Sequence, residues 1–258
     1  MRFFKYVLAF AVCCLTAYGC LEVDEEIAIN DDGSGVYNSK MDMSALVELM
    51  QTFAGEEKMK EEGLDKAIDT VINFSSILDS AKELSAEQKV LLKDAKMHMQ
   101  MNMKENLFKI NMNIPYKDFA SLKKLLETSG GGSGAMSEVM KGAISSDKND
   151  EQANNEQPDF GNMTNFYTVT VEKGLISKKV DQEKFQQMMA RPEMAQMSQM
   201  KESGMEILYT TSIKLPRPVK KIDNDLFKLS DDKKTVTMKY NMLEMLSTPE
   251  KFNFTIEY

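Results

Sequence analysis

The sequence has little of what most enzymatic mechanisms need. Its 258 residues include no tryptophan, three cysteines and one histidine, His98, and they contain neither a Gly-x-Ser-x-Gly nucleophile elbow nor a phosphate loop ending in Gly-Lys-Ser/Thr. A nucleophile and its base need groups that exchange protons near neutral pH. Carboxylates are plentiful, but they lie on predicted helix surfaces, as in Glu56-Glu57 and Glu61-Glu62. A catalytic pair of carboxylates far apart in the chain stays open, but we expect a protein that is not an enzyme and uses no cofactor.

The chain is acidic, with a formal net charge of −8 at pH 7. A protein of this charge offers no broad basic patch to nucleic acid or to anionic lipid headgroups, so neither is an expected partner. The run Asp31–Gly35 has some likeness to a calcium loop. The acidic spacing and the closing Glu of an EF-hand are missing, which favours a simple turn.

The first 19 residues have the order of an export signal. Two cations in Met1–Lys5 precede an unbroken apolar run, Tyr6–Leu15, and small residues lead to Cys20. The run is too short for a membrane span, which takes roughly 20 residues. Cleavage between Gly19 and Cys20 would remove the two other cysteines, so no disulfide could form and the fold must depend on its core.

Ala17-Tyr18-Gly19-Cys20 resembles the lipobox of bacterial lipoproteins. In those proteins cleavage falls just before the cysteine, which then receives acyl chains such as palmitate and anchors the protein to the membrane. The resemblance implies lipidation of Cys20. Leu21 stands where an Asp would resemble the inner-membrane retention signal of enteric bacteria, so the implied location is the outer membrane of the cell envelope, on its periplasmic side or at the cell surface.

Alternation of apolar and polar residues predicts strands along much of the chain after Cys20. In the clearest case, Met97, Met99, Met101 and Met103 alternate with polar residues, and the chain returns through the alternating arm Phe108–Ile114. The predicted strands comprise hairpins near residues 22, 97, 165 and 226, a long strand over Glu206–Leu215, and a closing strand over Phe252–Tyr258.

The methionine run with His98 inside it also suggests a copper site, because thioether and imidazole ligands suit Cu(I). In a strand, however, the four methionine side chains point one way and His98 points the other, so they cannot converge on one ion. The pattern therefore predicts a methionine-lined core face and no metal site. Methionine is flexible and polarizable, and such a face could also line a cavity for acyl chains.

Apolar residues at spacings of three and four predict helices between the strands. They are expected over Ala45–Phe53 with Ser44 as its cap, over Leu64–Leu78, after the capping box that begins at Ser85, over Lys117–Thr128, over Asp181–Met200 with a kink near Pro192, and over Met242–Leu246. Residues 129–160 form a Gly-, Ser- and Asn-rich linker that we expect to be flexible, since it has few apolar side chains to bury.

The linker divides the chain into a first half, residues 20–128, and a second half, residues 161–258, which we expect to share one sheet. The predicted fold class is α+β. It consists of an antiparallel β-sheet built from several hairpins and covered on one face by amphipathic helices.

Three motifs resemble lipoproteins of Bacteroidota to which no activity is assigned. They are the lipobox, the hairpin sequence Glu25–Gly35 and the strand pair Leu229–Thr237. The resemblance implies an envelope location and no particular activity. Asp69-Thr70-Val71 and Asp79-Ser80-Ala81 also resemble O-glycosylation sites of that phylum, which implies modification of Thr70 and Ser80.

Taken together, the sequence predicts a membrane-anchored envelope lipoprotein that binds or holds an envelope protein, with Ser129–Pro158 as one candidate contact segment. The runner-up is a carrier of lipid or another hydrophobic ligand, because a curved sheet with helices over one face can enclose an apolar cavity. A packed core explains the same apolar residues without a ligand. Because the apolar residues need no ligand to explain them, we favour partner binding over carriage of a ligand.

Overall fold

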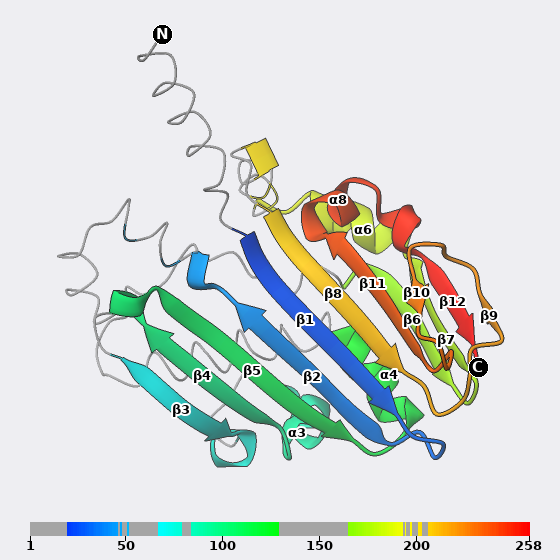
Figure 1. The fold of residues 1–258 in the computed structure, drawn as a ribbon, viewed down its shortest axis with the longest axis horizontal. Helices are drawn as coiled ribbons and strands as arrows, with labels where there is room; N and C mark the ends of the chain where they lie inside the picture. Colours follow the sequence, from blue (N-terminus) through cyan, green and yellow to red (C-terminus); the bar gives the residue numbers. More distant parts are fainter. Residues whose placement is uncertain are drawn as a thin grey trace, which may run out of the picture.

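The structure is a computed structural model. It describes residues 20–45, 67–78, 84–128, 165–192 and 206–258, together with residues 47, 51, 194, 197, 201 and 202. These residues form an α+β fold built around two β-sheets, which confirms the predicted fold class. Figure 1 shows the larger sheet with the smaller sheet and the helices α3 and α4 behind the same face.

The larger sheet has eight strands in the order β10-β11-β8-β1-β2-β5-β4-β3. These strands are β1 (Cys20–Ile29), β2 (Gly35–Asp42), β3 (Ile68–Asn73), β4 (Lys96–Asn102), β5 (Leu107–Tyr116), β8 (Glu206–Lys214), β10 (Lys228–Leu229) and β11 (Thr235–Asn241). The smaller sheet has four strands in the order β6-β7-β12-β9. They are β6 (Tyr167–Glu172), β7 (Leu175–Val180), β9 (Lys221–Ile222) and β12 (Phe254–Glu257).

Helices and short 3-10 turns connect these strands. The helices are α3 (Ala86–Leu92), α4 (Phe119–Thr128), α6 (Gln182–Met189) and α8 (Met242–Ser247), and the 3-10 turns are η1 (Phe74–Ser76), η2 (Met103–Glu105) and η4 (Pro249–Phe252). The helices α4 and α8 lie where the sequence predicted them. The capping box that opens α3 is also confirmed, because the Ser85 hydroxyl accepts the Gln88 amide at 3.2 Å and the Ser85 amide donates to the Gln88 side chain at 2.9 Å.

All four predicted hairpins are confirmed, since β1–β2, β4–β5, β6–β7 and β10–β11 each pair antiparallel. The β1–β2 turn is the simple turn that the sequence predicted. Within it the Asp32 carboxylate accepts hydrogen bonds from the amide and the hydroxyl of Ser34 at 3.0 and 2.6 Å. These bonds hold the pKa of Asp32 below its usual value.

The centre of the larger sheet is a parallel pair, which the sequence pattern did not predict. β1 lies between β2 and β8, antiparallel to the first and parallel to the second. The larger sheet thus takes β1 to β5 from before residue 129 and β8, β10 and β11 from after residue 164, while the smaller sheet is built wholly from the later part.

The predicted helix over Leu64–Leu78 is wrong where the structure describes it. Ile68–Asn73 is instead the edge strand β3, paired antiparallel with β4. The apolar residues at 68, 71 and 72 fit a helical period, but Ile68, Thr70 and Ile72 also alternate with Asp69, Val71 and Asn73. Pairing with β4 selected the period of two, and it left Val71 59% exposed on the outer side.

The predicted helix cap at Ser44 is wrong as well. The Asp42 carboxylate accepts the Ser44 amide at 3.0 Å, and the Ser44 hydroxyl instead accepts the Phe108 amide of β5 at 3.2 Å. The helix expected to follow is helical at its described residues Ala45, Val47 and Gln51, and its other residues lie outside the described ones. The predicted linker over residues 129–160 also lies outside them. The predicted Asp181–Met200 helix is interrupted near Pro192 as expected, since α6 ends at Met189 and helix resumes by Met194.

One continuous core fills the space behind the larger sheet. It joins the inward side chains of both sheets with those of α4 and α8, and many of its members, such as Tyr37, Ile114, Leu122, Val236 and Ile256, have no exposed surface. Figure 1 shows the opposite face of the larger sheet without a covering layer of described elements. We call it the open face.

Gly33→Ala should destabilise the fold more than Gly174→Ala. Both glycines have left-handed φ angles, +86° and +87°, so each substitution carries about 1–2 kcal/mol of backbone strain. A Cβ at Gly33 would lie 2.5 Å from the Phe119 ring of α4, whereas at Gly174 the nearest atom is the Tyr258 carbonyl at 3.1 Å. We expect the Gly33 variant to lose at least about 1 kcal/mol more free energy of unfolding in urea denaturation. Equal losses would contradict the close packing of α4 on this turn.

Candidate functional site

The predicted anchor residue, Cys20, is the first residue of β1. It pairs with Glu206 of β8, and from Glu22 onward β1 also pairs with β2. A membrane anchor at Cys20 would therefore lead into the central strand without an intervening linker. In the described parts of the chain, no helix has the length and apolar character to cross a membrane. Lipidation of Cys20 and cleavage after Gly19 stay predictions.

The two predicted glycosylation sites stay predictions as well. Thr70 lies on β3 in register with Met99 of β4, which is only 6% exposed. Because paired residues point to the same side of a sheet, Thr70 faces the inner side, where a glycan would have little room. Ser80 lies outside the described residues.

The methionine run lines the core, as the sequence predicted. Met97 and Met99 join the main core, while Met101 and Met103 pack against Val47 in a small second cluster. His98 points to the open face, where its Nε2 lies 2.6 Å from the Asp69 carboxylate. The hydrogen bond from His98 lowers the pKa of Asp69. The imidazole and the thioethers are therefore on opposite sides of β4.

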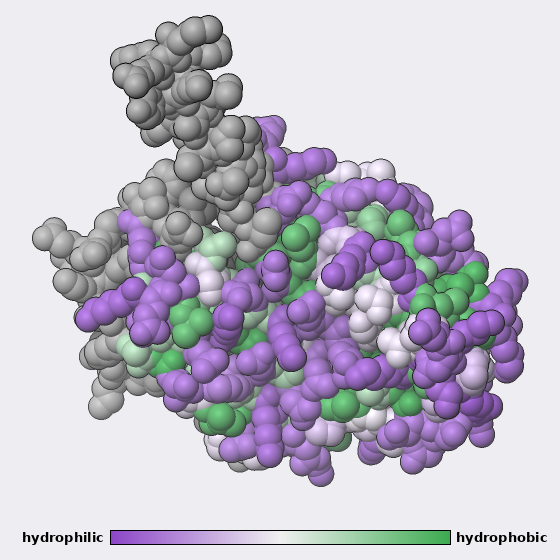
Figure 2. Space-filling view, viewed as in Figure 1, coloured by the Kyte–Doolittle hydropathy of each residue, from purple (hydrophilic) through white to green (hydrophobic). Residues whose placement is uncertain are grey.

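The open face is polar across the sheet, and Figure 2 shows it as a mainly hydrophilic surface with scattered apolar spots. The strand register arranges its side chains in rows. The row through Asp24 runs Lys239, Thr210, Asp24, Lys40, Asn111, His98 and Val71. Ion pairs join neighbouring strands at 3.1 Å from Lys109 to Asp42 and at 2.7 Å from Lys214 to Glu26. Exposed pairs of this kind contribute at most about 1 kcal/mol each to folding stability. The charged side chains of the open face are tolerated mainly because water solvates them.

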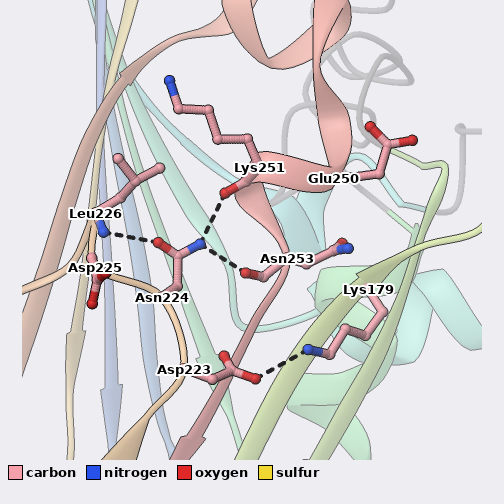
Figure 3. Close-up of a pocket in the computed structure, with 8 residues that line it drawn as sticks. All are labelled: Lys179, Asp223, Asn224, Asp225, Leu226, Glu250, Lys251 and Asn253. Atoms are coloured by element: carbon pink, nitrogen blue, oxygen red, sulfur yellow. Dashed lines mark hydrogen bonds and ion pairs between the residues drawn. The ribbon is translucent and has the colours of Figure 1, made fainter.

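A pocket of about 410 Å³ lies beside the smaller sheet, between the β9–β10 connection and η4. Asn224 is the centre of its hydrogen bonds (Figure 3). Its side-chain amide donates to the carbonyls of Lys251 and Asn253 at 3.0 and 2.7 Å, and its oxygen accepts the Leu226 amide at 2.8 Å. Nearby, Lys179 pairs with Asp223 at 3.2 Å. These polar groups tie the β9–β10 loop to η4, to the residue before β12 and to β7, which is a structural role.

A second pocket, of about 400 Å³, lies next to the start of β8, near the predicted anchor. Lys201 donates to the Ser247 hydroxyl at 2.9 Å, and Lys251 pairs with Glu244 at 2.5 Å. Both pockets are open and lined mostly by charged and polar side chains. Neither has the enclosed apolar lining that a bound acyl chain requires.

The most perturbed ionisable groups lie between the two sheets. Glu25 is the one charged residue among the inward-facing described residues of the larger sheet, in register with Ser39 of β2 and Thr211 of β8. Its carboxylate accepts hydrogen bonds from the Tyr37 hydroxyl at 2.8 Å and from the Thr211 hydroxyl at 3.2 Å. Burial raises the pKa of Glu25, and the bond from Tyr37 and the charge of Lys178 only partly oppose that effect.

Lys178 of β7 is the counterpart of Glu25 in the smaller sheet. It is the one charged residue among the inward-facing described residues of that sheet, flanked by Val169 and Phe254. Its ammonium lies 4.3 Å from the centre of the Tyr167 ring, and the hydroxyl of Tyr167 donates to the Pro249 carbonyl at 3.0 Å. Burial lowers the pKa of Lys178, and attraction to Glu25 acts in the opposite direction. We call Glu25 and Lys178 the interlayer pair.

Sequence reasoning missed the interlayer pair, although a signal for Glu25 was present. Val23, Ile27 and Ile29 share the side of β1 that is buried. Glu25 lies on the same parity, so the alternation already placed one carboxylate inside. Glu25 lies within the acidic run Glu22–Glu26, so composition alone does not distinguish it from the exposed carboxylates beside it. Lys178, in the run Ser177-Lys178-Lys179, carried no comparable signal.

Replacing Asn224 by Ala should destabilise the fold by about 2–3 kcal/mol, because three hydrogen bonds of about 1 kcal/mol each are lost at one residue. The measurement is the free energy of unfolding from urea denaturation. Asp225→Ala is the matched control, since Asp225 is an exposed neighbour that lines the same pocket, and it should change stability by less than about 0.5 kcal/mol. Similar losses in both variants would contradict the structural role of Asn224.

No family model, curated protein or solved structure matches the chain.

Proposed function

We propose that this chain is a lipid-anchored protein of the bacterial outer membrane that binds an envelope protein and carries out no chemical reaction. The observation that carries the proposal is the position of Cys20 at the start of the central strand. If Cys20 is acylated, the sheet is attached to the membrane by its own rigid framework. Such an anchor would hold the open face at a fixed distance from the membrane.

The height follows from strand geometry. β1 has ten residues, from Cys20 to Ile29, and a strand rises about 3.3 Å per residue, so the open face would extend to roughly 30 Å from the anchor if β1 stood upright. A partner that meets this face must itself lie close to the membrane. The occupant we propose for the open face is therefore another envelope protein with a polar surface.

The chemistry of the open face agrees with such a partner. β1 presents Glu22, Asp24 and Glu26 in a line, with Lys40 on the neighbouring strand β2 and Lys239 two strands away on β11. Charges of both signs in fixed rows favour a partner with a complementary pattern, and polar contacts of this kind give orientation and association rate more than affinity. We therefore expect a reversible complex.

Carriage of a hydrophobic ligand is less well supported. Its main sequence argument was the methionine face, and Met97, Met99, Met101 and Met103 are 0–8% exposed in packed clusters. A packed methionine needs no ligand to explain it. The two pockets described above are open and polar, which suits solvent or a protein surface better than an acyl chain.

Acylation should depend on Cys20. In a bacterium fed a palmitate analogue that can be labelled, the wild-type protein should incorporate the analogue and fractionate with the outer membrane. Cys20→Ala should abolish both the label and the membrane association, because several acyl chains on one cysteine are needed for a lasting anchor. Membrane association that persists without label in Cys20→Ala would contradict the proposed anchor.

Photo-crosslinking tests the open face. A photoreactive residue at position 24 or 40 should capture the same protein, identified by mass spectrometry as an envelope protein. The same residue at Thr168 or Glu172, which are exposed on the outward side of the smaller sheet, should not. Asp24→Lys should reduce capture from position 40 several-fold through charge repulsion. Equal capture from both sheets, or no change with Asp24→Lys, would count against the open face.

A further inference from the structure

Each sheet places one charged residue in the space between the layers, and the two charges have opposite signs. Glu25 comes from β1 at the centre of the larger sheet, and Lys178 comes from β7 at the centre of the smaller one. The inward neighbours of Lys178 on β6 and β12 are apolar. Contact between the layers is therefore apolar packing around one electrostatic pair.

Within the larger sheet, the strands that face Glu25 contribute uncharged polar groups. Tyr37 and Ser39 come from β2, Tyr209 and Thr211 from β8, and Tyr240 from β11. Burial raises the pKa values of Tyr37, Tyr209 and Tyr240 above the ordinary range of tyrosine. Burial also raises the pKa of Tyr167, the ring beneath Lys178. These phenols stay neutral at physiological pH, so Glu25 and Lys178 are the groups in this cluster that can change charge.

We propose that Glu25 and Lys178 make the packing of the smaller sheet on the larger one depend on pH, with the two layers held most tightly when Glu25 carries a proton. The device needs no ligand. It rests on the inward position of the two charges and on the hydrogen bonds that fix Glu25, and it is independent of the function proposed above.

We compare a closed state, in which the two sheets are packed together, with an open state, in which they have separated. The direction of the pH effect depends on which of these states binds the proton of Glu25 more strongly. With the layers apart, water reaches Glu25 and its pKa returns toward 4.5, the value from which burial raises it. The closed state therefore keeps a proton at pH values where the open state has lost it. As pH rises from 4.5 through the raised pKa of Glu25, the closed state loses this advantage and opening becomes easier.

Lys178 acts in the opposite direction at higher pH. Its pKa is lowered in the closed state and returns toward 10.5 when water reaches it. The closed state therefore gains stability as pH rises from that lowered pKa to 10.5. Both side chains are half-buried between the layers. Interlayer contact should be weakest between the two windows, where both are charged, because desolvation is the largest effect on each.

Other carboxylates act in a separate range. The pKa values of several aspartates, among them Asp42, Asp69 and Asp223, lie below the usual 3.8. Their contribution to stability is present above pH 3.8 and is lost as pH falls below that value through their lowered pKa values. His98 faces the open side of β4, away from the space between the layers. A change in interlayer contact above pH 4.5 can therefore be assigned to the interlayer pair.

Native-state hydrogen exchange of residues 21–258 measures the effect locally. Opening constants, corrected for intrinsic exchange, should rise between pH 5 and pH 7.5 for amides of β6 and β7, because the closed state loses its proton-binding advantage over this range. Amides of β5, a strand far from the pair that has no histidine or carboxylate, serve as the internal reference and should stay constant. Glu25→Gln should make the β6–β7 constants independent of pH in this range.

Glu26→Gln is the matched control variant, because Glu26 lies next to Glu25 but points to the open face and pairs with Lys214. It should keep the wild-type pH dependence. A carbon-13 titration of the Glu25 carboxyl in the wild-type protein gives a second readout that needs no variant. An ordinary or lowered pKa for Glu25, or the same pH dependence in Glu25→Gln as in the wild type, would overturn the proposal.

Discussion

The pairing of β1 on both edges is the constraint on which the rest of the structure depends. Its register with β2 and β8 decides which of its side chains face the core. A slip of one residue would bury Glu22, Asp24 and Glu26 and expose Val23 and Ile27. Burying each carboxylate without a partner costs several kcal/mol, so the acidic run on β1 selects one register against its neighbours. Glu25 is the exception that this register leaves inside.

Local features of the fold followed from the sequence, and long-range ones did not. Hairpins such as β4–β5 need only alternation and a nearby turn, both of which are visible in a short stretch of residues. The parallel contact of β1 with β8 joins residues that are 186 positions apart in the sequence, as in the hydrogen bond from Thr211 to Glu25. Nothing in the sequence of either strand identifies the other as its partner. Ile68–Asn73 shows the same limit, because its apolar residues fit two periods and a partner strand decided between them.

The candidate sites also differ in whether local sequence patterns could predict them. Cys20 and the methionine face were predicted from local patterns, and the burial of Met97 and Met99 confirmed the core interpretation. The interlayer pair could not be predicted as a pair, since Lys178 faces Glu25 across the core only because two sheets pack face to face. Alternation on β1 could have placed Glu25 inside, but no local signal indicated which positive charge lies opposite.

In the proposed arrangement, the anchor and the interlayer pair belong to the same strand. Glu25 follows Cys20 by five residues, which is about 17 Å along a strand. That distance is about two Debye lengths at physiological ionic strength, so the potential of an anionic membrane surface falls to roughly one-seventh before it reaches Glu25. A surface potential of about −30 mV would then change the local pH at Glu25 by less than about 0.1. Glu25 would therefore respond to the pH of the surrounding compartment and not to the charge of the membrane that holds the protein.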